Sequence, residues 1–359
     1  MQWRKSQLFC ACEHARNSCT TLARHDVGIM PTGRREKAVP SGDTADMRRV
    51  VLAVAAAMML AACSSTAVNQ PGTSAPTEPA EATTTVSITA ADLPAIVPLA
   101  TTTDGADPQR IVSLASGVGE SLVALGVGDR VVGRDETSDV DALSQVPIVT
   151  AAHSVSAERV LDLEPDLVII DARTTPSEAL DQIAASGVRL VEVPEAWTLS
   201  DIAPRIEAVA AAVGVDPGPL LDGLPSDIPP EADAPRVAFL YLRGTAGIYL
   251  LGGAGSGADS IIAAAGGIDV GAQAGYDAFI PLTAEALATL DPDVVIVMTK
   301  GLESVNGIDG LVALPGVAQT TAGRERRIIV VDDAILLSFG PRTPALIEEL
   351  REAITQVSP

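Results

Sequence analysis

The sequence contains little cysteine, 4 residues in 359. Three cysteines stand near the start of the chain with two histidines, in a spacing that matches no zinc-binding pattern: Cys10, Cys12, Cys19, His14 and His25. The fourth is Cys63, which would be alone if the N-terminal segment were removed. The sequence therefore predicts neither a disulfide framework nor a zinc site from its cysteines.

Positive charge is also scarce, with 24 Lys and Arg residues against 46 Asp and Glu and a formal net charge of −22. Residues 1–62 hold 9 of the basic and 5 of the acidic residues, so the remainder carries 15 against 41, a formal charge of −26. Such an excess repels polyanions and argues against nucleic acid as a partner. It favours a folded body that stays dispersed in solution.

Motifs of common enzymes are missing as well. Gly252–Gly257 is rich in glycine, but it lacks the Lys-Ser/Thr pair of a phosphate-binding loop and the acidic partner of a nucleotide fingerprint. We therefore expect it to form a turn into a helix. No Ser-His-Asp arrangement or pair of catalytic carboxylates stands out. The sequence predicts no enzymatic activity.

A short basic segment, Met47–Arg49, precedes the apolar run Val50–Leu60 and then Cys63. This is the layout of a secretory signal peptide, and the run is too short for an ordinary membrane span, although a short membrane anchor is the alternative. The small residues before Cys63 are similar to a bacterial lipobox, which implies cleavage before that residue and lipid on its thiol. We expect translation to begin at Met47, with 1–46 a misannotated upstream extension and 47–62 the signal peptide.

The segment that follows is rich in Ala, Thr, Pro and Ser and shows no helical period. We interpret residues 63–107 as a flexible tether that holds the folded body away from the membrane.

Beyond the tether, short apolar runs alternate with amphipathic segments, which predicts an α/β fold with mainly parallel sheets. Strands are expected at 111–114, 130–134, 146–149, 167–170, 190–193, 237–242, 248–251, 293–298 and 328–331. Helices are expected at 119–125, 156–163, 177–185, 202–213, 258–265, 283–290 and 344–354. The pattern indicates an N-terminal lobe over 108–215, a connector over 216–235 and a C-terminal lobe over 236–359.

The run Val237–Leu242 opens the second lobe as a buried strand that continues to Arg243. A period of two puts Tyr241 and Arg243 on one face of this strand. A nearby guanidinium stabilises a phenolate over a phenol, and tyrosine is one of the axial ligands known for haem iron. A core tyrosine beside an edge arginine is the alternative interpretation.

Three segments of the first lobe resemble the substrate-binding proteins of ABC importers for ferric siderophores, cobalamin and haem: Arg110–Leu114, Glu120–Gly133 and Val160–Val168. Four further segments resemble the haem-binding lipoproteins of actinobacterial haemin uptake: Phe239–Gly247, Gly255–Ile262, Met298–Ser304 and Phe339–Arg342. The resemblance covers nearly all of residues 108–357. It implies the two-lobed fold of class III binding proteins, with the ligand between the lobes.

The resemblance also implies a site. Ferric haem b would be the transported ligand, with His153 and Tyr241 as axial ligands and Arg243 bonded to the tyrosine oxygen. Tyr276 and Met298 match positions in the pocket of the second lobe. A thioether prefers softer metals than ferric iron, so Met298 is expected to pack beside the porphyrin.

Docking to a permease with its ATPase is implied too. Glu120 matches the first-lobe carboxylate that pairs with permease arginines, and a solvated charge at a helix start is its plainer interpretation. Asp259 is the nearest acid in the second lobe, one residue out of register. Cell-surface haem-binding proteins would act upstream, and the protein would sit on the outer face of the cytoplasmic membrane. Cobalamin or a ferric siderophore is the alternative ligand.

The connector departs from the resemblance, because that family joins its lobes with a long helix. Residues 216–235 contain six prolines: Pro217, Pro219, Pro225, Pro229, Pro230 and Pro235. Each interior proline costs a helix about 3 kcal/mol. The sequence therefore predicts a short, irregular connector.

Overall fold

The computed structural model of the protein describes residues 85–101, 107–151, 154–243 and 248–358, all within the compact unit Glu78–Pro359. The expected signal peptide, Cys63 and His153 lie outside these stretches. Within them, no helix combines the length and the apolar character needed to cross a bilayer.

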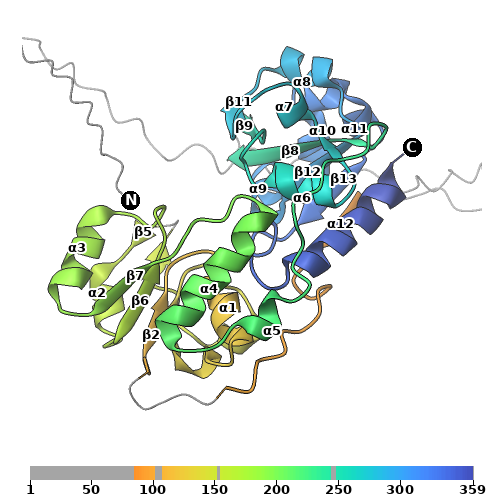
Figure 1. Ribbon diagram of the computed structural model, residues 1–359. Helices are drawn as coiled ribbons and strands as arrows, with labels where there is room; N and C mark the ends of the chain where they lie inside the picture. The colour runs from red at the N-terminus through yellow and green to blue at the C-terminus, as the bar shows by residue number, and fades with distance from the viewer. Residues whose placement is uncertain (1–84, 102–106, 152–153, 244–247, 359) are drawn as a thin grey trace, which may run out of the picture. The chain divides into compact units, whose positions relative to one another are not determined.

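The N-terminal lobe is built on a fully parallel sheet of four strands in the order β3-β2-β6-β7 (Figure 1). The strands are β2 (Ile111–Ser113), β3 (Val131–Arg134), β6 (Leu167–Ile170) and β7 (Arg189–Glu192). The helices of this lobe are α1 (Val118–Ala124), α2 (Ala157–Leu161), α3 (Ser177–Ala185) and α4 (Ile202–Val213). Every residue of β2 and β6 is buried, as expected for central strands of a parallel sheet covered on both faces.

Local signals set the helix ends of this lobe as the sequence predicts. The Ser156 hydroxyl accepts a hydrogen bond from the backbone N–H of Arg159 and so caps α2. At the other end of the lobe, α4 stops where Gly214 adopts a left-handed conformation with φ 76°.

The expected strand over 146–149 is wrong. Only a single bridge joins Ile148 to Arg134, and the regular pairing falls one step later, in the hairpin of β4 (Thr150–Ala151) and β5 (Ser154–Val155). Pro147 explains the difference, because it has no N–H to donate to a ladder. Its carbonyl accepts from the backbone N–H of Arg134.

The C-terminal lobe contains a seven-stranded mixed sheet in the order β1-β13-β12-β8-β9-β11, with β10 beside β8. The strands are β1 (Thr85–Ile88), β8 (Arg236–Arg243), β9 (Ile248–Leu251), β10 (Ile268–Asp269), β11 (Ile280–Pro281), β12 (Val294–Met298) and β13 (Ile328–Val331). β1, β13, β12 and β8 run parallel, whereas β9 and β11 are antiparallel to their neighbours. The helices are α6 (Ala258–Ala264), α7 (Val270–Gln273), α8 (Ala284–Leu290), α9 (Thr299–Ser304), α10 (Gly307–Ala313), α11 (Thr321–Arg324) and α12 (Thr343–Val357).

The strand β1 corrects the interpretation of residues 63–107 as an unstructured tether. Thr85–Ile88 pairs in parallel with Ile328–Val331 and forms the outer edge of the C-terminal sheet. Ile88 and Leu93 are both buried in that lobe's core. The strand has four residues, two of them apolar, and the segment around it is rich in Thr and Ala. Its composition therefore does not distinguish it from an unstructured segment.

The connector agrees with its prolines. Between the end of α4 and the start of β8, the structure contains one helix, α5 (Gly218–Leu221), of four residues. Asp227 fixes its later part, because this side chain accepts hydrogen bonds from the backbone N–H of Leu199 at 3.0 Å and from the Ser260 hydroxyl at 2.6 Å.

Candidate functional site

Tyr241 lies near the carboxyl end of β8, at the edge of the sheet where ligands of α/β proteins usually bind. Its ring packs edge-on against Phe279, with 5.7 Å between the centroids and 68° between the planes. Met298 is the last residue of the neighbouring parallel strand β12. Because Val297 pairs with Leu240, the residues that follow them, Met298 and Tyr241, lie at the same level of the sheet. Tyr241, Phe279 and Met298 are all half-buried against one core cluster. The structure thus brings together two of the predicted pocket residues.

Tyr276 does not join them. It packs against the core cluster that contains Leu240 and Leu242, whose side chains leave β8 on the face opposite Phe239 and Tyr241. Arg243 is the last residue of β8, two positions beyond Tyr241, and its side chain lies outside the described residues.

His153 also lies outside the described residues, but its neighbours are placed. β4 and β5 pair on either side of positions 152–153, with Ala151 opposite Ser154. The backbone N–H of Val155 donates to the carbonyl of Thr175 at 2.8 Å, and Ser154 bridges Thr175. This anchors the hairpin to the segment that follows β6, at the carboxyl edge of the N-terminal sheet.

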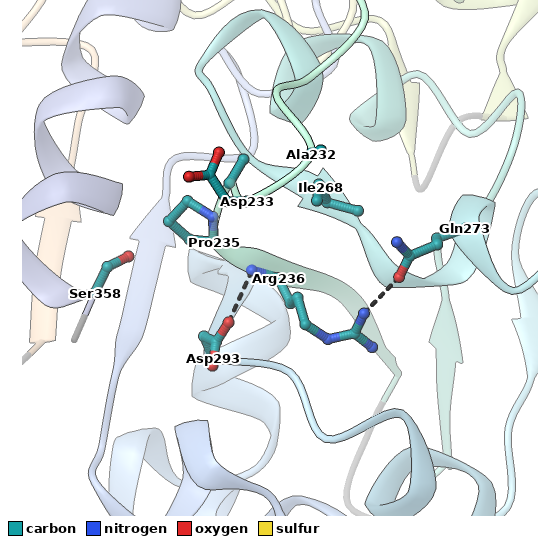
Figure 2. Close-up of a pocket in the computed structure, with 9 residues that line it drawn as sticks. Ala232, Asp233, Pro235, Arg236, Ile268, Gln273, Asp293 and Ser358 are labelled. Carbon is teal, nitrogen blue, oxygen red and sulfur yellow. Dashed lines mark hydrogen bonds between the residues drawn. The ribbon is translucent and has the colours of Figure 1, made fainter.

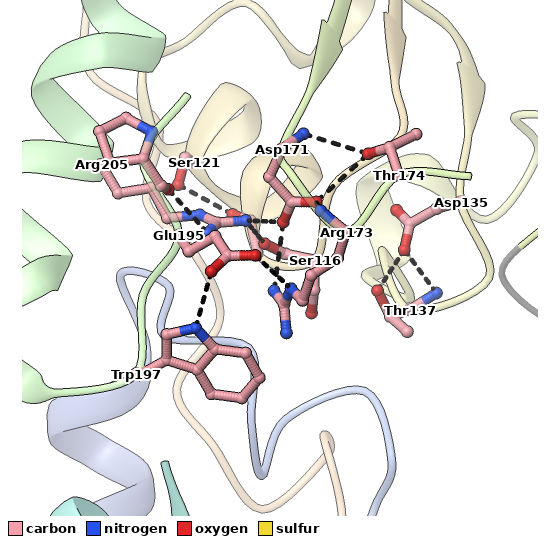
Figure 3. A network of polar contacts seen from close by, with 12 residues as sticks. Ser116, Ser121, Asp135, Thr137, Asp171, Arg173, Thr174, Glu195, Trp197 and Arg205 are labelled. Atoms are coloured by element: carbon pink, nitrogen blue, oxygen red, sulfur yellow. Dashed lines mark hydrogen bonds and ion pairs between the residues drawn. The ribbon is translucent and has the colours of Figure 1, made fainter. Parts of the chain in front are cut away.

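The same edge carries a polar network that sequence reasoning missed (Figure 3). Arg205 of α4 is almost fully buried, and its Nη2 lies 3.3 Å from Oδ2 of Asp171, the residue after β6. Its Nη1 donates to the carbonyl of Pro194 at 3.0 Å. Burial lowers the pKa of Arg205, although Asp171 opposes that effect. A buried charge requires such partners.

Arg173 forms the exposed side of this network. Its Nη2 lies 3.2 Å from Oδ2 of Asp171, its Nε lies 3.7 Å from Glu195, and its guanidinium carbon lies 4.6 Å from the ring centroid of Trp197. The indole N–H of Trp197 donates to Glu195 at 3.0 Å. Figure 3 shows Arg173 between the two carboxylates. The sequence gives little indication of this network, because its residues meet only when β6 and β7 pair.

Glu120 is buried, so the interpretation of a solvated charge at the start of α1 is wrong. Its Oε1 accepts a hydrogen bond from the backbone N–H of Arg342 at 2.6 Å and lies 3.3 Å from the Nε of that residue. Burial raises the pKa of Glu120, and the charge of Arg342 acts in the opposite direction. In this structure the carboxylate binds an arginine of its own chain.

Asp259, in the first turn of α6, binds the glycine-rich loop before it. Its two carboxylate oxygens accept hydrogen bonds from the backbone N–H groups of Gly255 at 2.8 Å and Gly257 at 3.0 Å. Both glycines have positive φ, 80° and 84°, which explains why glycine is used there. Residues 252–257 are therefore a turn into a helix, as the sequence predicts.

A separate hollow of about 370 Å³ lies at the opposite, amino end of β8 (Figure 2). Arg236 crosses it, with its backbone N–H donating to Asp293 at 3.0 Å and its guanidinium donating to Gln273. None of the predicted haem residues lines it. Among the described residues, no group of three or more His, Cys, Asp or Glu side chains could hold a metal ion.

The sequence and the fold match known binding proteins. RhuT, a periplasmic haem-binding protein from Roseiflexus sp. RS-1 solved in apo form, is 38% identical with a TM-score of 0.61, over 69% of this chain and 98% of that one. YvrC, an uncharacterised ABC transporter substrate-binding lipoprotein of Bacillus subtilis, is 25% identical over 69% of this chain and 80% of its own length. A vitamin B12-binding protein of Pectobacterium carotovorum is 30% identical over 104 residues, 29% of this chain and 37% of that protein.

The family model described as periplasmic binding protein matches residues 111–216 and 222–335, more than half of the chain. The expected two-lobed class III fold is confirmed by these matches. Proteins of this kind bind substrates for ABC transporters and are not enzymes. The chain therefore belongs to the periplasmic binding protein family.

Proposed function

We propose that this protein captures ferric haem outside the cytoplasm and delivers it to the permease of an ABC importer. The observation that carries the proposal is the position of Tyr241, a half-buried phenol at the carboxyl end of β8, beside Met298 and edge-on to Phe279. A tyrosine oxygen is an established haem ligand. The identity to RhuT over almost the whole of that haem-binding protein supports the same ligand class.

In this proposal, Tyr241 and His153 are the axial ligands. Arg243 bonds the tyrosine oxygen, and Met298 packs beside the porphyrin. Tyr276 belongs to the site only if haem also reaches the other face of β8, where that residue packs. Glu120 and Asp259 contact the permease only if they exchange their present partners, Arg342 and the glycine-rich loop.

The proposal includes anchorage at Cys63 on the outer face of the cytoplasmic membrane, which the lipoprotein YvrC supports by similarity. We keep the domain boundaries expected from the sequence as part of the proposal, with one change, because Thr85–Ile88 belongs to the C-terminal sheet.

The test is a titration of the purified protein with haemin, cobalamin and a ferric siderophore, followed by absorption spectra. Haem transport requires saturable binding of haemin, with a tyrosinate-type spectrum. Cobalamin is the second candidate, since a vitamin B12-binding protein matches part of the chain. Saturable binding of cobalamin with only unspecific uptake of haemin would reverse the assignment.

A further inference from the structure

Arg173 lies at the carboxyl edge of the N-terminal sheet, in the segment to which the hairpin of β4 and β5 is anchored. It follows β6, and the same segment continues to Thr175, whose carbonyl accepts a hydrogen bond from the backbone N–H of Val155 in β5. β6 and β7 are parallel neighbours, so the residues after them meet at one sheet edge. This brings Trp197 to Arg173 as well.

The guanidinium of Arg173 is held in place before any ligand arrives. Asp171 contacts its Nη2 at 3.2 Å, Glu195 lies 3.7 Å from its Nε, and its carbon lies 4.6 Å from the Trp197 ring centroid. An arginine restrained in this way loses little side-chain freedom when it binds a ligand.

Arg173 and Arg205 together face two carboxylates, Asp171 and Glu195, so these four charges balance, and Arg173 is the more exposed of the two cations. Oδ2 of Asp171 is shared with the buried Arg205, whose Nη2 lies 3.3 Å away. The side chain of Arg173 remains 37% exposed, whereas that of Arg205 is 2% exposed. One fixed guanidinium therefore faces solvent at the ligand-binding edge of a chain with net charge −22. A guanidinium binds a carboxylate through paired hydrogen bonds, so a carboxylate is the ligand group that Arg173 would recognise.

We propose that Arg173, positioned by Asp171 and Trp197, binds a carboxylate of the transported ligand. This inference rests on the proposed function, in which that carboxylate is a porphyrin propionate. The half-buried ring of Trp197 packs against the guanidinium and so holds the cation beside an aromatic side chain at this edge. Cobalamin carries amides in place of ionised propionates, so Arg173 also acts as a specificity residue.

The experiment compares haemin with haemin dimethyl ester, in which both propionates are uncharged. We expect wild-type protein to bind haemin more tightly than the ester, and added salt to reduce that preference. Arg173→Gln should weaken haemin binding roughly ten- to hundredfold, the effect of losing a charged hydrogen bond, and leave ester binding almost unchanged. Arg159→Gln, an equal charge change at an exposed position of α2, is the matched control and should bind both ligands as wild type does.

The outcomes separate the two proposals. If wild-type protein does not bind haemin, the proposed function fails and this inference fails with it. If wild-type protein binds haemin and its ester equally well, or Arg173→Gln weakens both to the same extent, haem binding stands and the carboxylate role is overturned. The wild-type comparison needs no variant, so equal binding of haemin and its ester overturns the carboxylate role even if Arg173→Gln does not fold.

Discussion

The Oε1 atom of Glu120 accepts a hydrogen bond from the backbone N–H of Arg342, 2.6 Å away and 222 residues later in the chain. The two side chains form an ion pair that is 5% and 13% exposed, so water screens it little. Arg342→Ala should therefore destabilise the protein by about 3–5 kcal/mol, because it leaves a buried carboxylate without its cation. Glu120→Gln should cost less, since its amide oxygen still accepts from the backbone. Urea unfolding measures both, with the exposed Arg159→Ala as control.

The same pair predicts a pH dependence. Because burial raises the pKa of Glu120 above its unfolded value of about 4.3, the folded protein binds this proton more tightly than the unfolded chain does. The contribution is fully present below the unfolded pKa and is lost as pH rises through the folded pKa. Wild type should lose stability relative to Glu120→Gln over that rise. A difference that grows in favour of wild type would mean that Arg342 outweighs burial.

Asp227 should stabilise the connector through the hydrogen bonds that its side chain accepts. Burial alone would raise its pKa, but hydrogen bonds from Ser200, Ser260 and the backbone of Leu199 outweigh burial and lower it. Its contribution is therefore present above the unfolded pKa near 3.9 and is lost as pH falls through the lower folded value. Because the side chain is exposed, Asp227→Ala should cost only about 1 kcal/mol at pH 7, the effect of a lost cap, and less in acid. Asp222→Ala, also exposed in the connector, should have no effect in parallel thermal melts.

Much of the fold could be predicted because its signals are local. The apolar spacing over 202–213 and the glycine after it set α4, and the residues of α3 follow from their pattern in the same way. β1 could not be found by this reasoning, since its four residues form a strand only because β13 offers an open edge more than 200 residues later.

Some residues of the candidate site could likewise be predicted from local sequence, and others could not. Tyr241 and Met298 stand out because each ends an apolar run, and parallel pairing of β8 with β12 brings them to one edge. Arg173 and Trp197 belong to different loops, and Glu120 and Arg342 to different lobes, so only the packed chain shows that they meet. Tyr276 was expected in the pocket, but its position along the chain does not reveal which face of β8 it covers.

The proposed lipid anchor at Cys63 predicts that substitution of this residue changes where the protein is found. If Cys63 carries lipid, Cys63→Ser should abolish labelling by a fatty-acid analogue and leave either a soluble protein or an uncleaved precursor. Fractionation of cells and medium, with immunoblotting, measures the outcome. Labelling of the Cys63→Ser variant at the wild-type level would place the lipid elsewhere.

If Tyr241 and His153 are the axial ligands, substitutions of the two residues should change the haem spectrum in different ways. Tyr241→Phe keeps the edge contact with Phe279 and should fold, but haemin affinity should fall at least about tenfold, the lower end for metal-site substitutions, and the tyrosinate bands should disappear. Tyr249→Phe is the control, since that phenol donates to the carbonyl of Pro315 at 3.0 Å, away from the site. His153→Ala should convert six-coordinate iron to five-coordinate iron. An unaltered spectrum for His153→Ala would mean that Tyr241 is the one axial ligand from the protein.

Arg243 should tune the release of haem by acid. If Tyr241 binds ferric iron through its oxygen, protons compete with the iron for that atom, and the proposed bond from Arg243, two residues along β8, would favour the phenolate. Removing that charge favours the protonated phenol, so the bond to iron should break at higher pH. We expect the release midpoint of Arg243→Ala to lie about one pH unit above that of wild type, the lower end of the effect of a neighbouring charge. Acid titration of both haem-loaded proteins, followed by absorbance, measures the midpoints, with Arg159→Ala as the charge-matched control. Coincident curves for Arg243→Ala and wild type would show that this arginine acts elsewhere, for example on a propionate.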